Sequence, residues 1–273
     1  MPLHVRVLGS SSSGNCTVVW DGTHALLVDC GFSPRYTFRN LRALGLGPSN
    51  LTGVLITHTH GDHFNEGVLG FLVEWRVPIC APESVAADLI KRSPAARTAA
   101  NEGLLRTFCD GSLEIAWFDV GCFEVPHDSP GGCYGYAIAH VEGQTRRTVS
   151  VATDVGFTGE HLRARFTDTD AIVFESNHDP MMLENSGRPE WLKQRIRKIG
   201  HLSNQQCAGF LADVFHHSTR PPAAVVLAHI SQTCNTNALA LECTHGELHR
   251  NGFSRTLVVE SFRMTANKVV TVK

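Results

Sequence analysis

The sequence has no apolar stretch long enough to cross a lipid bilayer. A transmembrane helix needs roughly 18 or more apolar residues in a row, whereas the longest runs here are short, such as residues 223–228. The first residues, which include His4 and Arg6, lack the apolar core of a secretory signal peptide. We therefore expect no membrane segment, no leader sequence and a cytoplasmic location.

Closely spaced cysteine pairs are missing as well. The 9 cysteines are odd in number and scattered, and no two of them form a CxxC pair. This pattern indicates neither a disulfide framework nor a zinc knuckle, and it suits a reducing compartment. The chain also lacks an excess of positive charge: its formal net charge of −2 argues against a protein that coats duplex DNA electrostatically, although a local basic groove remains compatible with it.

Internal repeats, low-complexity tracts and long linkers do not occur in the 273 residues, so we expect one domain over residues 1–273 with a large core. Apolar runs and alternation predict strands over residues 3–8, 15–20, 24–29, 54–57, 77–80, 113–118, 122–125, 134–141, 146–152, 172–174 and 224–228. Helical periodicity predicts helices over residues 34–46, 66–75, 83–91, 189–198, 203–216 and 237–250. This order of elements favours stacked sheets flanked by helices.

The most informative motif is the HxHxDH run formed by His58, His60, Asp62 and His63. It follows the apolar residues 54–57 and therefore lies where a strand ends and a loop begins. Side chains at positions i and i+2 of extended backbone point the same way, so His58 and His60 can bind one cation together. A turn after them lets Asp62 and His63 face a second cation. Imidazole nitrogen suits zinc, and the added carboxylate admits manganese or iron.

Three later side chains share the setting of this run, because each stands at or just beyond the end of an apolar strand: His127, Asp154 and His229. Taken singly, a histidine or an aspartate after a strand is more often a cap or a turn residue. Four ligands cannot complete two sites, however, and a dinuclear site needs a carboxylate that bridges both cations. We therefore expect these three strand ends to converge with the HxHxDH run in one cleft.

The HxHxDH run followed by these three residues, in this order, resembles the metallo-β-lactamase superfamily over essentially the whole chain. The resemblance implies an α+β fold, a four-layer αββα sandwich, that holds two divalent cations, Zn²⁺ or Mn²⁺, or else iron. It implies a first cation bound by His58, His60 and His127, a second bound by Asp62, His63 and His229, and Asp154 as the bridge between them. Asp29 matches the superfamily's early acidic residue, which supports the metal loop from behind; a simple strand-end cap is the alternative.

Several longer segments are similar to the YycJ/WalJ group of that superfamily, bacterial proteins regarded as single-strand DNA exonucleases. The similar segments are residues 9–16, 125–128, 152–156, 175–179 and 200–204. This resemblance implies a dinuclear metal-dependent phosphodiesterase, an exonuclease whose partner is single-stranded nucleic acid. Asp154 disfavours the most familiar β-lactamases, which carry Cys at that position, and His60 disfavours flavodiiron oxygen reductases, which carry Glu.

Glu175 and His201 are similar to the glutamate and the histidine in the HEAT and HST motifs of tRNA 3′-processing relatives. There the pair positions a proton donor near the scissile phosphate. By that resemblance a metal-activated hydroxide attacks phosphorus, Asp62 belongs to the catalytic group, and Glu175 orients His201, which protonates the departing alkoxide. A structural hydrogen bond between Glu175 and His201 is the alternative.

The candidate substrate-binding residues are His178, Lys193 and Arg197. His178 either contacts a phosphate or packs as a buried histidine. Lys193 and Arg197 are four positions apart on a predicted helix and share one face of it. That face either follows a nucleic-acid backbone or is simply solvated.

Two other functions stay open from the sequence. A hydrolase of small cyclic phosphates or of thioesters would use the same ligands. Glu175 and His201 favour phosphate, because a thioester has a good leaving group that needs less help from an acid. A metal-stabilised binding protein without activity is the second alternative, and the presence of all seven expected ligands counts against it. The oligomeric state also stays open.

Overall fold

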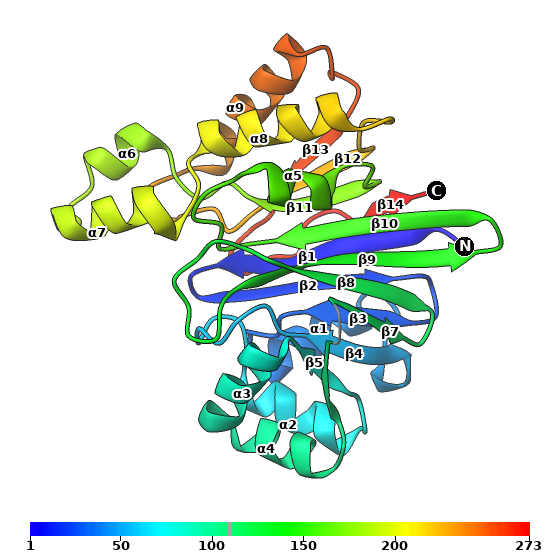
Figure 1. Ribbon diagram of the computed structural model, residues 1–273. Coiled ribbons are helices and arrows are strands. Elements are labelled where there is room, and N and C mark those ends of the chain that lie inside the picture. The colour runs from blue at the N-terminus through cyan, green and yellow to red at the C-terminus, as the bar shows by residue number, and fades with distance from the viewer. Residues whose placement is uncertain (109–110) are drawn as a thin grey trace.

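Two seven-stranded sheets lie face to face in the computed structural model of the protein, which describes residues 1–108 and 111–273 (Figure 1). The first sheet has the order β14 (Val270–Val272), β1 (Leu3–Ser11), β2 (Gly14–Trp20), β3 (Ala25–Val28), β4 (Leu51–Leu55), β5 (Ile79–Ala81) and β6 (Leu105–Thr107). The second has the order β13 (Leu257–Glu260), β12 (Ala224–Ala228), β11 (Ala171–Glu175), β10 (Thr145–Ala152), β9 (Tyr134–Glu142), β8 (Phe118–Glu124) and β7 (Ser112–Ile115).

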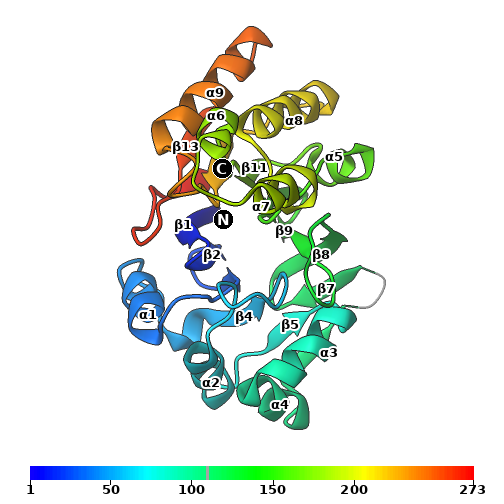
Figure 2. The same cartoon turned by 90° about the vertical axis from the view of Figure 1, so that its left-hand side faces the viewer.

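Helices cover the outer face of each sheet, as Figure 2 shows from the end of the sandwich. The first sheet carries α1 (Pro34–Arg42), α2 (Glu66–Glu74), α3 (Glu83–Arg92) and α4 (Pro94–Asn101), with the 3₁₀ turn η1 (Pro48–Asn50) before β4. The second carries α5 (Glu160–Phe166), α8 (Asn204–His217) and α9 (Asn237–Arg250). The predicted α+β fold, a four-layer αββα sandwich, is confirmed.

A further helical segment projects from one end of the second sheet (Figure 1). It consists of α6 (Pro180–Glu184), α7 (Glu190–Arg195) and the π-helical turn η2 (Ile196–Gly200). We call residues 180–200 the arm. The sequence predicts one regular helix over residues 189–198; the structure corrects this, because the last turn widens into the π-helical η2. Such π-helical turns are frequent at functional sites.

The core consists of apolar layers on both sides of each sheet. On β3, Leu26 faces the opposite sheet and Leu27 faces the helices. On β11, Val173 likewise faces the first sheet, whereas Phe174 packs under α8. Successive side chains of a strand point to opposite faces, and both faces are covered here, so these strands read as continuous apolar runs.

The boundaries predicted for the strands over residues 113–118 and 122–125 are wrong. The chain turns instead at Ala116, whose φ is 53°, between β7 and β8. A left-handed turn residue is usually Gly or Asn, so alanine carried no turn signal. The elements α4, α5, α6, β6, β13 and β14 are not anticipated by the sequence pattern; most of them are short.

Tyr136 joins the two sheets by a hydrogen bond that can be tested. Its side chain is fully buried on β9, and its hydroxyl donates to the carbonyl oxygen of Ile56, beyond β4, at 2.6 Å. Tyr136→Phe leaves that buried carbonyl unpaired, so we expect the free energy of unfolding, measured by urea titration, to fall by about 1–3 kcal/mol. Tyr134→Phe is the matched control, because Tyr134 is only half-buried and its hydroxyl lies 3.2 Å from Ser84 Oγ. Equal stabilities of the two variants would contradict this account.

Candidate metal centre

The loop after β4 is fixed from behind by the carboxylate of Asp29. The backbone N–H of Thr57 donates to Asp29 Oδ1 at 2.9 Å, and the Thr57 hydroxyl donates to the same carboxylate at 2.9–3.0 Å. His63 Nδ1 lies 2.7 Å from Asp29 Oδ2. Asp29 is therefore more than a strand-end cap: it holds both the start and the end of the HxHxDH loop.

The turn between β1 and β2 supports the same loop from the other side. Asn15 donates its backbone N–H to the carbonyl oxygen of Asp62 at 2.8 Å and its amide to Asp62 Oδ2 at 3.1 Å. A Cβ at Gly31 would lie 1.8 Å from that same carbonyl oxygen, so only glycine fits there. Ser10 links this turn to the second sheet: its hydroxyl donates to Asn15 Oδ1 at 2.7 Å and accepts from the N–H of His229 at 2.8 Å. Ser10 and Asn15 lie in the segment 9–16 that resembles the YycJ/WalJ group, but their supporting roles have no local signal in the sequence because the contacts are long-range.

Three residues at strand ends have left-handed backbone that is unusual for residues other than glycine. They are Asp29 after β3, Asp154 after β10 and His229 after β12, with φ of 59°, 58° and 53°. Such conformations are sparsely populated and tend to occur at functional sites. Here each of them places a buried side chain at the carboxyl end of a strand, beside the HxHxDH loop.

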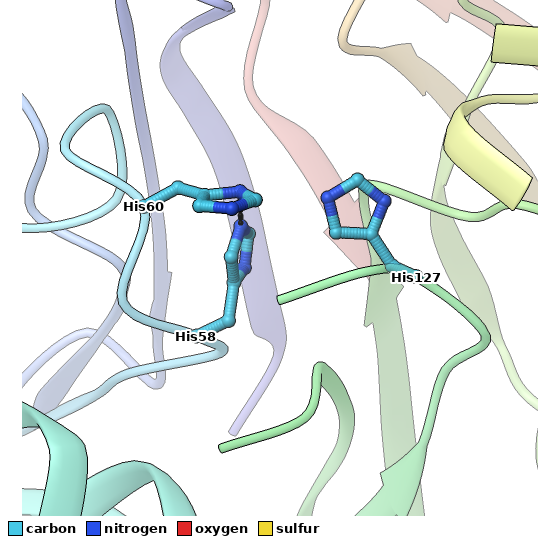
Figure 3. A group of neighbouring side chains, drawn as sticks. All are labelled: His58, His60 and His127. Carbon is cyan, nitrogen blue, oxygen red and sulfur yellow. Dashed lines mark hydrogen bonds between the residues drawn. The ribbon is translucent and has the colours of Figure 1, made fainter. Parts of the chain in front are cut away.

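The predicted ligands come together around Asp154. His58, His60 and His127 each offer one nitrogen within 4.8 Å of the other two (Figure 3). Three further groups meet the same criterion. They are His58, His63 and Asp154; Asp62, His63 and His229; and Asp154, Glu175, His201 and His229. His63 Nε2 lies 3.1 Å from Asp154 Oδ2, and His229 Nε2 lies 3.7 Å from Asp154 Oδ1. The arrangement therefore contains two groups of donors with a carboxylate between them.

Two inward-facing atoms of this cluster test whether divalent cations fit. His127 Nε2 and His229 Nε2 are buried and have no hydrogen-bond partner among the described residues. Unpaired buried polar atoms are costly and rare, and cations bound by these atoms would pair them. The outer nitrogens are held: His127 Nδ1 donates to the Gly200 carbonyl oxygen at 2.9 Å, and His229 Nδ1 lies 2.8 Å from Glu175 Oε2. This is the usual support of histidine ligands, so the residues fit a dinuclear N/O site.

The charge states of His58 and Asp154 suit the same chemistry, whereas His63 and His229 must lose a proton when they bind a cation. Burial opposes protonation of these two histidines, but the neighbouring carboxylates raise the pKa of His63 well above its usual value and that of His229 to about 10. Burial and the neighbouring His63 hold the pKa of His58 well below its usual value, which leaves a neutral imidazole at pH 7. Burial alone would raise the pKa of Asp154, but His229 and His63 hold it well below its usual range. Neutral imidazole and ionised carboxylate are the forms that bind cations.

Glu175 is the buried connection between the ligands and His201. It ends β11 and accepts backbone N–H groups from Asp154 at 3.0 Å and from Leu202 at 2.9 Å. Its Oε2 also lies 3.1 Å from His201 Nδ1. Although burial opposes ionisation, the nearby His201 and His229 lower the pKa of Glu175 to about 2. Glu175 is thus ionised, and it fixes the position of the His201 side chain.

A cleft of about 240 Å³ opens over this cluster. Its floor includes His60, Asp62, His127, Asp154 and His229, and His201 also lines it. The arm forms one wall through Leu183, Arg188, Leu192, Arg195 and Ile196. All four strand-end or loop segments that supply the predicted ligands thus meet at one opening.

Of the three predicted substrate-binding residues, the structure places only His178 in the cleft. His178 lines the cleft and is buried, and this burial lowers its pKa to about 4. Lys193 and Arg197 do not line it. The Lys193 ammonium donates to the carbonyl oxygen of Glu184, and Arg197 pairs with Glu184 at 2.5 Å and Glu190 at 2.6 Å. The helix face that these two cations share therefore packs on α6, which the sequence did not predict.

The family model described as "Beta-lactamase superfamily domain" matches residues 24–230 of the chain. The chain belongs to the β-lactamase superfamily. It is 31% identical over 259 residues to "Exodeoxyribonuclease YycJ" of Bacillus anthracis, which covers 93% of this chain and 92% of that protein. It is also 28% identical over 242 residues to "Exodeoxyribonuclease WalJ" of Streptococcus pneumoniae, covering 86% and 84%.

A solved structure supports the fold of this superfamily member. The metallo-β-lactamase fold protein YhfI from Bacillus subtilis matches with a TM-score of 0.69 and 15% identity over 99% of both chains. The predicted resemblance to the metallo-β-lactamase superfamily and its YycJ/WalJ group is confirmed. No helix within residues 1–108 and 111–273 is both long and apolar enough to span a membrane.

The role of Asp29 in this β-lactamase superfamily site can be tested through metal affinity. Asp29→Asn keeps the size of the side chain but removes the charge that faces His63. We expect metal affinity, measured by competition with a chromogenic chelator, to fall about 10- to 100-fold. Asp168→Asn is the control, because Asp168 has a similar φ of 59° but precedes β11 at the end remote from the cluster. Unchanged affinity in Asp29→Asn would show that Asp29 does not support the ligands.

Proposed function

We propose that the protein is a dinuclear metal-dependent phosphodiesterase that degrades single-stranded DNA from an end. The observation that carries the proposal is the Glu175–His201 pair beside the ligand group centred on Asp154. Such a pair suits a reaction whose leaving group needs a proton. The relatives named exodeoxyribonucleases support the choice of nucleic acid as the substrate.

The ligand residues would hold two cations. His58, His60 and His127 would bind the first, Asp62, His63 and His229 the second, and Asp154 both; the donor set suits Zn²⁺ or Mn²⁺. When bound, divalent cations in such a pair activate water and neutralise phosphate charge. Asp62, at the cleft floor, thus acts in catalysis as a ligand.

His201 would then supply the leaving-group proton. Its Nδ1 faces the Glu175 carboxylate at 3.1 Å, and its side chain lines the cleft, 22% exposed. A carboxylate behind an imidazole sets the orientation of the ring. Glu175 is therefore the positioning residue, and the alkoxide that leaves phosphorus receives its proton from His201.

The cleft limits how much of a substrate it can enclose, and the relatives named exodeoxyribonucleases support attack at a strand end. At about 240 Å³ it is smaller than the pockets of roughly 300–1,000 Å³ that enclose drug-sized ligands. It can enclose little more than one terminal residue of a strand. The same size also suits a small phosphodiester, which is the second candidate substrate.

One set of assays distinguishes the two candidate substrates, a single strand of DNA and a small phosphodiester. Wild-type protein loaded with Zn²⁺ or Mn²⁺ is given single-stranded DNA labelled at either end, bis-p-nitrophenyl phosphate and a glutathione thioester. We expect progressive shortening of the DNA from one end, hydrolysis of the bis-ester, and no thioester turnover. Hydrolysis of the bis-ester alone would favour a small-phosphodiester hydrolase. Thioester turnover alone, or no turnover of any substrate, would refute the phosphodiesterase proposal.

His201→Ala distinguishes a proton donor from a structural histidine. A DNA alkoxide needs a proton on departure, whereas p-nitrophenolate is a good leaving group that does not. We therefore expect turnover of DNA to fall about 10²- to 10⁴-fold, with a much smaller loss on bis-p-nitrophenyl phosphate and nearly unchanged metal content. Equal losses on both substrates would refute the donor role.

A further inference from the structure

The wall that the arm contributes to the cleft differs chemically from the floor. Leu183, Ile196 and Cys234 form a small buried apolar cluster, and Leu192 packs against it. All four residues line the cleft that contains the metal ligands. The opening therefore has a polar floor, where phosphate chemistry would occur, and an apolar wall on the arm side in which the partly exposed Leu192 covers the three buried residues.

Arg188 adds a positive charge to this wall. It is half-buried and lines the cleft, and one terminal guanidinium nitrogen donates to the Thr233 hydroxyl at 2.9 Å. Within the described part of the chain, no carboxylate lies within ion-pair distance of Arg188. By contrast, Arg195, the other arginine of this wall, pairs with Asp128 at 2.7 Å. The charge of Arg188 is thus available to a ligand in the cleft.

The apolar wall and the charge of Arg188 together suit a ligand that has both a nucleobase and a phosphate. A guanidinium beside a concave polar site binds phosphate bidentately, and an apolar surface accommodates the faces of a nucleobase. The scissile phosphate would sit over the ligand cluster, so the wall would meet the parts of the substrate on either side of it. A small phosphodiester with neither a base nor a second phosphate would leave this wall unused.

We infer that the arm forms a subsite for the terminal nucleotide of the substrate strand. Leu192, which packs over the buried residues Leu183, Ile196 and Cys234, receives the base, and Arg188 binds a phosphate other than the scissile one. This inference rests on the proposed function, and it goes further by naming the residues that distinguish a strand end from a simple ester.

The first test replaces the charge. Arg188→Ala is compared with Arg188→Lys and with Arg146→Ala, which removes an exposed arginine paired with Asp119 at the far end of β10 from Asp154. We expect Arg188→Ala to lower kcat/KM on single-stranded DNA about tenfold or more, and to reduce the salt dependence of log(kcat/KM) by about one unit of slope. Turnover of bis-p-nitrophenyl phosphate should stay unchanged. Arg188→Lys should recover part of the loss, and Arg146→Ala should match wild type.

The second test removes the base. An oligonucleotide with an abasic residue at the end that is degraded should be cut about tenfold more slowly than the intact strand by wild-type protein, since the abasic residue buries no apolar base surface against Leu192. An abasic residue in the middle of the strand is the control and should leave the first cleavage unchanged.

The outcomes separate this inference from the proposed function. If wild type degrades DNA but Arg188→Ala behaves like Arg146→Ala, or the abasic end is cut at the normal rate, the subsite is refuted and the nuclease proposal stands. If Arg188→Ala loses the bis-ester activity equally, Arg188 acts on the reacting phosphate or the fold, and the subsite is again refuted. If wild type does not degrade DNA at all, both proposals fail.

Discussion

The carboxylate of Asp154 is the group on which the rest of the site depends. It is buried and ionised between two sets of histidines, with His63 Nε2 3.1 Å away and His229 Nε2 3.7 Å away. A buried charge is tolerated only when opposite charge or a cation compensates it. Glu175 fixes the position of Asp154 by accepting its backbone N–H at 3.0 Å. The two sheets, in turn, are packed so that the strand ends on both sides reach this one carboxylate.

A hydrogen bond and close backbone packing connect the arm to the candidate metal centre. The carbonyl oxygen of Gly200, which ends η2, accepts from His127 Nδ1 at 2.9 Å, and His201 follows directly. A Cβ at Gly156 would lie 2.3 Å from the carbonyl oxygen of Ile199, so the arm also packs closely on the loop after β10. The position of the arm therefore determines at once the orientation of a ligand, the placement of the proposed proton donor and the shape of the cleft wall.

The sequence predicted those metal-site residues that belong to a local pattern, either a contiguous motif or the end of an apolar strand. The HxHxDH run is contiguous, and Asp154 and His229 stand directly after apolar strands, so their convergence follows from the fold class. The left-handed backbone of Asp154 and His229 has no local signal. The roles of Lys193 and Arg188 depend on where α6 packs: helical spacing identified Lys193, whereas the structure places Arg188 in the cleft wall. Tertiary contacts of this kind are not encoded in the spacing of residues along one helix.

The central claim is that the ligand groups on either side of Asp154 hold two cations together. Anomalous X-ray diffraction from crystals of the wild-type protein grown with Zn²⁺ or Mn²⁺ tests it directly. Two peaks are expected, one beside His58, His60 and His127 and one beside Asp62, His63 and His229, with the Asp154 carboxylate between them. A single peak, or peaks away from Asp154, would contradict it.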